Sequence, residues 1–120
     1  MREILFRGRG HNGLWNYGDH VRIDGKSHIK PDTYEMLLIE VDPDTVGQYT
    51  GLEDKNGVNI FEGDIARDST SVFKVEFRFD GWHFVRVSGF YQYPSFYSNA
   101  NRVEVIGNIH DNPKLLEESQ

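Results

Sequence analysis

The stretch "GLEDKNGVNIFEGDI", residues 51–65, combines two turn signals with a cluster of acidic residues. These residues are Glu53, Asp54, Glu62 and Asp64. Carboxylates grouped in this way could coordinate a cation or act as a general acid and base. A calcium loop of the EF-hand type that begins at Asp54 requires glycine at its sixth position and glutamate at its twelfth. The sequence has Asn59 and Ile65 at these positions, which excludes such a loop.

Turn formation explains the same residues without a role in cation binding or catalysis. Asn56-Gly57 is a strong hairpin signal, and the bend at residues 62–64 leads into a new strand at Ile65. On this interpretation the carboxylates are solvated turn residues. A catalytic pair of Glu62 and Asp64 stays open as an alternative, although no base, nucleophile or metal ligand lies nearby in the sequence.

No signature of an enzyme or of a metal site accompanies this stretch. The histidines are His11, His20, His28, His83 and His110. They lack paired ligand spacing, and without cysteine there is no thiolate ligand for zinc. No nucleophile elbow or phosphate-binding glycine loop is present either. The sequence therefore predicts no catalytic residue, no metal and no cofactor, and favours a function other than catalysis.

The segment "GFYQYPSFYSNAN", residues 89–101, is the best candidate for binding a partner or ligand. Its aromatic residues are Phe90, Tyr91, Tyr93, Phe96 and Tyr97. Such rings could stack on bases, hold a ligand or anchor a protein interface, and the alternative is that they cap one end of a barrel.

Nucleic-acid binding is the alternative function, and it needs cations beside the aromatic rings. These are more frequent in "FRGRGHNGLWNY", where Arg7 and Arg9 precede Trp15. The formal net charge of -6 disfavours nonspecific binding to nucleic acid. Nucleic acid is therefore the less favoured partner.

Negative charge is concentrated in one part of the chain. Residues 31–64 contain nine acidic residues and one base, Lys55, whereas the arginines and lysines gather towards the amino terminus. We interpret this acidic region as a solvated surface. The alternative is a docking surface for a basic partner, such as a host protein.

The period of apolar alternation is two, with frequent turn signals, which predicts a mainly β protein. Asn12-Gly13 and Asp24-Gly25 predict hairpins, and residues 34–41 favour a strand over a short helix. A further hairpin over residues 71–87 is expected to turn at Asp80-Gly81.

The turn at Asp80-Gly81 would place Phe79 opposite Trp82 and Phe77 opposite Phe84.

After the final predicted strand, Asn112 and Pro113 predict the start of a short terminal helix. The expected fold is therefore small antiparallel sheets or a partly open barrel, an SH3-like barrel among the alternatives, with a short C-terminal helix.

A length of 120 residues predicts one domain, 1–120, with sub-lobes 1–45 and 46–112 and a terminal helix or tail at 113–120. The chain has neither cysteine nor an apolar run that could form a signal peptide or a membrane span. We expect a cytoplasmic protein. Small β domains leave edge strands that need covering, so a homo-oligomer is one expected state.

Three stretches resemble the YopX family of bacteriophage and prophage proteins. They are "MREILFRG", "QYTGLEDKNGVNIFEGDI" and "VEVIGNIHDNP". The resemblance covers both ends and the middle of the chain. It implies a mainly β phage protein that acts in the cytoplasm of the bacterial host, for which the family supplies no established activity or catalytic residues. The family glycines at 51, 57, 63 and 107 are expected to shape the backbone.

Overall fold

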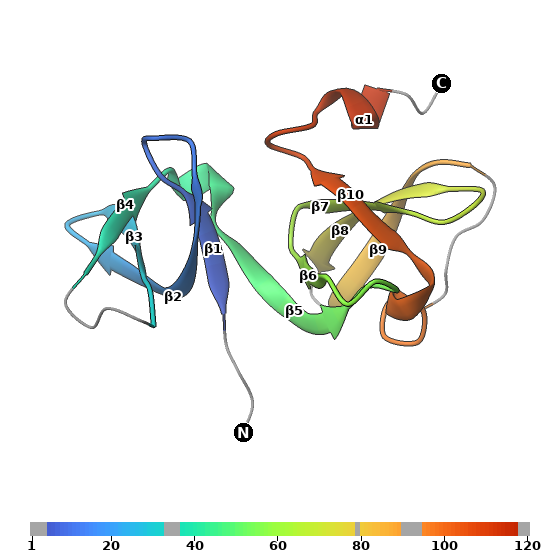
Figure 1. Ribbon diagram of the computed structural model, residues 1–120, viewed down its shortest axis with the longest axis horizontal. Helices are drawn as coiled ribbons and strands as arrows, with labels where there is room; N and C mark the ends of the chain where they lie inside the picture. Colours follow the sequence, from blue (N-terminus) through green and yellow to red (C-terminus); the bar gives the residue numbers. More distant parts are fainter. Residues whose placement is uncertain (1–4, 33–36, 79, 90–94, 118–120) are drawn as a thin grey trace. The chain divides into compact units, whose positions relative to one another are not determined.

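The computed structural model describes residues 5–32, 37–78, 80–89 and 95–117. The chain divides into two compact units, Met1–Tyr49 and Thr50–Gln120 (Figure 1). Strand β5 belongs to both units. Its first residues, Gly47 and Gln48, pair with β1 in the first unit, and its remainder runs beside β6 in the second.

The described residues form ten strands in two sheets. The six-stranded sheet has the order β4-β3-β2-β1-β5-β6, and the four-stranded sheet has the order β10-β7-β8-β9. The strands are β1 (Phe6–Arg9), β2 (Trp15–Ile23), β3 (Lys26–Lys30), β4 (Ile39–Val41), β5 (Gly47–Glu53), β6 (Asn59–Phe61), β7 (Asp64–Arg67), β8 (Val72–Arg78), β9 (Gly81–Ser88) and β10 (Glu104–Asn108). The helical elements are the 3-10 turns η1 (Pro43–Thr45) and η2 (Ala100–Arg102) and the helix α1 (Lys114–Glu117).

The predicted fold class is confirmed, since the protein is mainly β with two antiparallel sheets and a short C-terminal helix. Both sheets are open, with β4 and β6 at the edges of one and β10 and β9 at the edges of the other. Of the strand predicted over residues 34–41, Ile39–Val41 forms β4, and residues 34–36 lie outside the described part of the chain.

The two hairpins predicted in the first unit are confirmed. Asn12 and Gly13 lie in the connection between β1 and β2, where Gly13 has a φ of 83°. Asp24 and Gly25 connect β2 to β3 with φ angles of 51° and 78°. Positive φ at both central residues is the geometry of a type I′ turn, whose twist suits a two-residue hairpin.

Close packing between strands fixes the core of the first unit. Ile29 and Val41 are buried there, and a ring contact joins Phe6 to His20 with centroids 5.7 Å apart. Gly8 lies against Val41 so closely that a Cβ atom on Gly8 would be 2.7 Å from Val41 Cγ2. Any larger residue at position 8 would therefore push against the buried valine.

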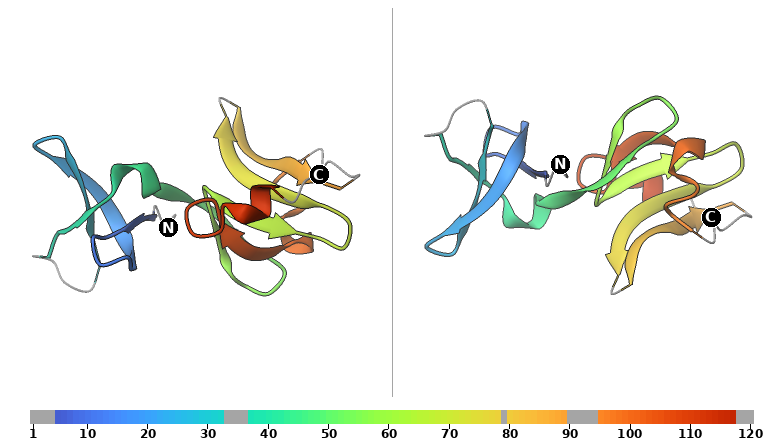
Figure 2. Two further views of the ribbon diagram at one scale, coloured as in Figure 1. Left: turned by 90° about the horizontal axis from the view of Figure 1, so that it is seen from above. Right: turned by 90° about the horizontal axis from the view of Figure 1, so that it is seen from below.

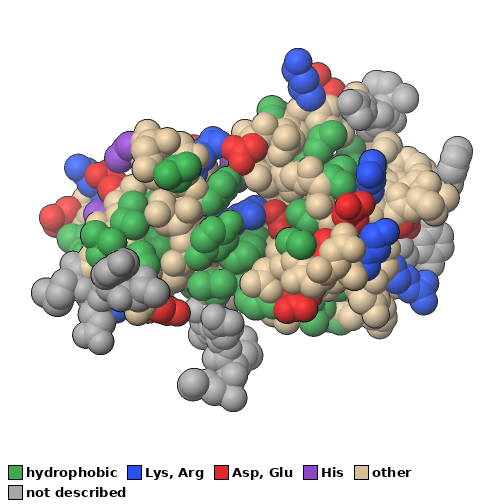
Figure 3. All heavy atoms as spheres, viewed as in Figure 1, with side chains coloured by type: hydrophobic (Ala, Val, Ile, Leu, Met, Phe, Trp, Pro, Cys, Tyr) green, Lys and Arg blue, Asp and Glu red, His purple; other side chains and the backbone are tan. Residues whose placement is uncertain are grey.

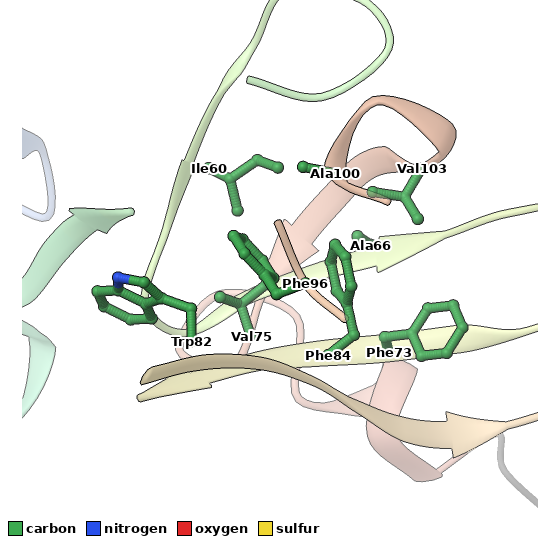
Figure 4. Close-up of a cluster of buried hydrophobic side chains, with 9 residues drawn as sticks. All are labelled: Ile60, Ala66, Phe73, Val75, Trp82, Phe84, Phe96, Ala100 and Val103. Atoms are coloured by element: carbon green, nitrogen blue, oxygen red, sulfur yellow. The ribbon is translucent and has the colours of Figure 1, made fainter. Parts of the chain in front are cut away.

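An aromatic cluster forms the core of the second unit (Figure 4). Phe73 on β8 and Phe84 on β9 have ring centroids 5.5 Å apart, and the Phe96 ring lies 4.6 Å from that of Phe84. The remaining members are Ile60, Ala66, Val75, Trp82, Ala100 and Val103. These residues come from β6 to β9 and from the segment before β10. The cluster therefore brings early and late parts of the second unit's sequence into contact.

The predicted register of the β8–β9 hairpin is wrong. Phe77 pairs with Trp82, and Phe84 pairs with Val75, a shift of two residues that keeps the apolar face but changes every partner. Gly81 pairs with Arg78 and is the first residue of β9, so the turn precedes Gly81 and is not centred on Asp80-Gly81. Figure 2 shows the resulting hairpin as a twisted two-stranded ribbon.

The predicted terminal helix is confirmed, but α1 begins at Lys114, one residue after the predicted first position, Pro113. The backbone amide of Leu115 donates to the carbonyl of Asn112, and that of Leu116 donates to the carbonyl of Pro113. The Asn112 side chain does not act as the predicted N-cap, since its Oδ1 accepts a hydrogen bond from the backbone amide of Asn108, before the helix, at 3.1 Å.

Two phenylalanines on the same face of β8 provide a test of the core. Phe73 is fully buried, whereas Phe77 is 55% exposed. We predict that Phe73→Ala lowers the free energy of unfolding by about 3–5 kcal/mol. The matched change Phe77→Ala is expected to lower it by less than about 1 kcal/mol. Urea denaturation followed by tryptophan fluorescence measures both, and equal losses would contradict the assigned core.

Candidate functional site

The acidic turn between β5 and β6 is built around the carboxylate of Asp54. Asp54 Oδ1 accepts hydrogen bonds from the backbone amides of Asn56 and Val58, at 2.8 and 2.9 Å. Asp54 Oδ2 accepts from the backbone amide of Val105 on β10, at 2.8 Å. The residue is 5% exposed. This carboxylate therefore closes its own turn and also attaches that turn to a distant strand.

The second bend of the segment has the same structural character. Asp64 is buried, and its Oδ2 accepts a hydrogen bond from the backbone amide of Phe61 at 2.8 Å. The neighbouring Gly63 has a φ of 89°, donates to the carbonyl of Val75 and accepts from the amide of Ile109. The bend is thus joined to β8 and to the chain after β10.

The expectation that all these carboxylates are solvated is wrong for Asp54 and Asp64. Backbone amides satisfy both buried side chains, which makes their burial favourable. Glu53 is exposed and Glu62 is half-buried. The two carboxylates of the alternative catalytic pair therefore differ in environment. Asp64 is buried and accepts a hydrogen bond from a backbone amide, whereas Glu62 is half-buried.

The motif after β10 is fixed by asparagine side chains. Asn108 Oδ1 accepts from the backbone amides of His110 and Asp111, at 3.0 and 2.9 Å. A Cβ atom on Gly107 would lie 2.4 Å from Asn112 Oδ1, so glycine is required there for packing. The segment "GNIHDNP" thus folds back on itself beside the bend at Gly63.

Neither a metal cluster nor a membrane-crossing helix is found in the described part of the chain. No three side chains of histidine, aspartate or glutamate converge on one point within it. Nor does any helix there have the length and apolar character needed to cross a bilayer.

The amino-terminal arginines bind their own aromatic neighbour. Arg7 is buried with its guanidinium carbon 4.6 Å from the centroid of the Trp15 ring, and the Arg9 guanidinium carbon is 5.7 Å from the same ring. These cation–π contacts explain why β1 and β2 carry this combination of residues. Stacking on a nucleic acid base would require these same side chains, which already contact one another within the protein.

The predicted aromatic segment is only partly within the described residues. Phe90, Tyr91 and Tyr93 lie outside them. Phe96 is buried in the core of the second unit, whereas Tyr97 is 58% exposed. Of the described candidates, Tyr97 therefore presents its ring to solvent and Phe96 supports it, with ring centroids 5.7 Å apart in an edge-on geometry.

Phe77 and Tyr97 are two exposed aromatic residues, called the aromatic pair below, that each contact Trp82, and the sequence did not predict this arrangement. The Phe77 ring packs edge-on against Trp82 at 5.0 Å, and the Tyr97 hydroxyl lies 3.5 Å from the backbone nitrogen of Trp82. Phe77 therefore contacts the ring of the buried Trp82, and Tyr97 approaches the backbone of the same residue through its hydroxyl. In the sequence, Phe77 alternates with polar residues just as the buried Phe73 does, so this pattern alone did not predict that Phe77 is exposed.

Charged residues on the other face of the hairpin form a short ladder. Glu76 lies between Lys74 and Arg78, at 2.9 and 3.1 Å. Burial alone would raise the pKa of Glu76, but hydrogen bonds from these two cations outweigh it and lower that pKa. At the turn, His83 Nε2 donates to Asp80 Oδ1 at 2.6 Å, and this bond lowers the pKa of the Asp80 carboxyl.

The family described as "YopX protein" matches residues 6–117. The chain therefore belongs to the YopX family.

The fold is also similar to a solved structure, the crystal structure of protein EF1440 from Enterococcus faecalis. The two share 24% sequence identity and a TM-score of 0.60, over 97% of this chain and 99% of the other. This similarity concerns the fold. No curated protein matches the chain.

The structural role of Asp54 predicts a large and specific loss of stability on its removal. Asp54→Ala leaves three backbone amides without their acceptor, so we expect the free energy of unfolding to fall by about 3 kcal/mol. Glu53→Ala, a change at the exposed neighbour, is expected to alter it by less than about 0.5 kcal/mol. Urea denaturation of the two variants measures the difference, and a stable Asp54→Ala protein would disprove the assigned role.

The hydrogen bond at the hairpin turn predicts a pH-dependent contribution from Asp80. Because its pKa in the folded state is lowered, the carboxylate stabilises the fold above its unfolded pKa of about 4. The contribution is lost as pH falls through the folded pKa. Asp80→Asn should therefore lower the urea midpoint at about pH 6 and lower it progressively less as pH falls below the unfolded pKa of about 4. A difference that is constant across this range would contradict the hydrogen bond.

Proposed function

We propose that this YopX family protein is a non-enzymatic accessory protein of a phage or prophage and acts in the host cytoplasm as a small β binding module. The observation that supports this proposal is the exposure of Phe77 and Tyr97, which both contact Trp82, Phe77 through its ring and Tyr97 through its hydroxyl. The partner we propose is another protein, from the host or the phage, or a second copy of the chain.

The chemistry of the pair suits protein recognition. Aromatic side chains in rigid settings contribute much of the energy of protein interfaces, because their burial removes a large apolar area from water. A neighbour that already holds each ring in place lowers the entropy lost on binding. Here Trp82 holds Phe77, and Phe96 holds Tyr97.

Two further observations support a binding role over the alternatives. The buried carboxylates Asp54 and Asp64 already accept hydrogen bonds from backbone amides, which suits a structural role better than hydrolysis. Arg7 and Arg9 stack on Trp15, so a nucleic acid would have to displace contacts within the protein.

The aromatic pair can be tested with a double variant. We expect Phe77→Ala with Tyr97→Ala to keep the fold and to lose proteins that the wild type retains in a pull-down from prophage-bearing host lysate. Tyr17→Ala is the matched control, since Tyr17 is an exposed aromatic of the first unit. Light scattering on the purified proteins identifies self-association as the retained interaction.

Two outcomes would contradict the proposal. One is equal retention by the wild type and the double variant. The other is saturable binding of labelled single-stranded oligonucleotides at low salt that is abolished by Arg9→Gln and unaffected by the double variant. The second outcome would favour the nucleic-acid alternative.

A further inference from the structure

A charged pocket lies on the second unit, at the end of its sheet where β7 ends and β10 begins. It has a volume of about 340 Å³ and is lined by Lys55, Arg67, Asp68, Ser69 and Glu104. This volume is at the lower end of the range for small-ligand sites. Lys55 is also the single base of the acidic stretch from 31 to 64. Neither the acidic turns nor the aromatic pair explains it.

The backbone fixes the positions of the lining residues. The amide of Lys55 donates to the carbonyl of Val103 at 3.0 Å, which holds the β5–β6 turn beside the start of β10. Glu104 on β10 is paired directly with Arg67 on β7. The loop that contains Ser69 is closed by a hydrogen bond from the Asp68 amide to the carbonyl of Ser71, at 3.0 Å.

The pocket contains side-chain hydrogen-bond donors that have no acceptor among the described residues. No described residue forms a hydrogen bond or an ion pair with the side chains of Lys55 or Ser69. Arg67 forms an ion pair with Glu104, but the distance of 3.8 Å from Nε to Oε1 is too long for a hydrogen bond.

The acids in the pocket compete weakly for these donors. Asp68 Oδ1 accepts from the backbone amides of Thr70 and Ser71, both at 2.8 Å, so part of this carboxylate is committed to its own loop. Glu104 is half-buried and can leave Arg67 by a rotamer change. In the view of Figure 3, basic and acidic side chains alternate over this unit without a large region of one sign.

We infer that this pocket binds an oxyanion, either a phosphate or a carboxylate group of a small ligand, with Lys55, Arg67 and Ser69 as its donors. A guanidinium presents paired N–H groups that match two oxygens of such a group, and the ammonium adds a mobile charge. The bound oxyanion replaces Glu104 as the partner of Arg67. The inference is independent of the aromatic pair, so the Phe77→Ala, Tyr97→Ala protein should bind the anion unchanged.

The test is an NMR titration of the full chain with inorganic phosphate and, separately, with acetate, at an ionic strength kept constant with sodium chloride. We expect saturable shifts of the amides of Lys55 and of residues 67–69 with at least one anion. Lys55→Gln should weaken binding about tenfold, because a charged hydrogen bond is lost. Glu104→Gln should tighten it, because the competing carboxylate is removed. Lys26→Gln, at an exposed lysine of the first unit, should leave it unchanged.

The two arms identify the group, since preferential saturation by phosphate or by acetate assigns the ligand class. Three results would overturn the inference. The first is no saturable shift with either anion up to about 50 mM. The second is the same shifts with chloride alone. The third is equal weakening by Lys55→Gln and Lys26→Gln, which would show that the anions respond only to overall charge.

Discussion

The second unit depends on one buried carboxylate. Asp54 accepts three backbone hydrogen bonds, two within its own turn and one from Val105, which is 51 residues further along the chain. A single side chain therefore sets the shape of the β5–β6 turn and attaches it to the last strand. Such a group is favourable inside a protein only when amides replace the water that it loses.

The same constraint explains why the acidic motif is structural. The bend at Gly63 bonds to Val75 on one side and to Ile109 on the other, so the second turn of the motif also joins the end of the chain to the sheet. Two of the three stretches that resemble the family are thus neighbours in space. Their glycines and buried acids fix the backbone where the two stretches meet.

Local signals were sufficient to predict much of the fold but little of the candidate site. The Asn12-Gly13 and Asp24-Gly25 hairpins follow from turn chemistry, which acts over a few residues. The β8–β9 register could not be obtained in this way, because Gly81 pairs with Arg78 within the strands and does not lie at the centre of the turn, as its dipeptide suggests. Nor could the partner of Asp54, which lies on a distant strand, or the exposure of Phe77, which depends on that register.

Native-state hydrogen exchange tests the central role of Asp54 most directly, since it reports on the individual amides that the carboxylate holds. We predict that the amides of Val58 and Val105 exchange slowly, through opening of most of the second unit, as the amides of Phe73 and its neighbours in the core strands do. Exchange of these two amides at the rate of an unprotected turn, while the core strands stay protected, would contradict it.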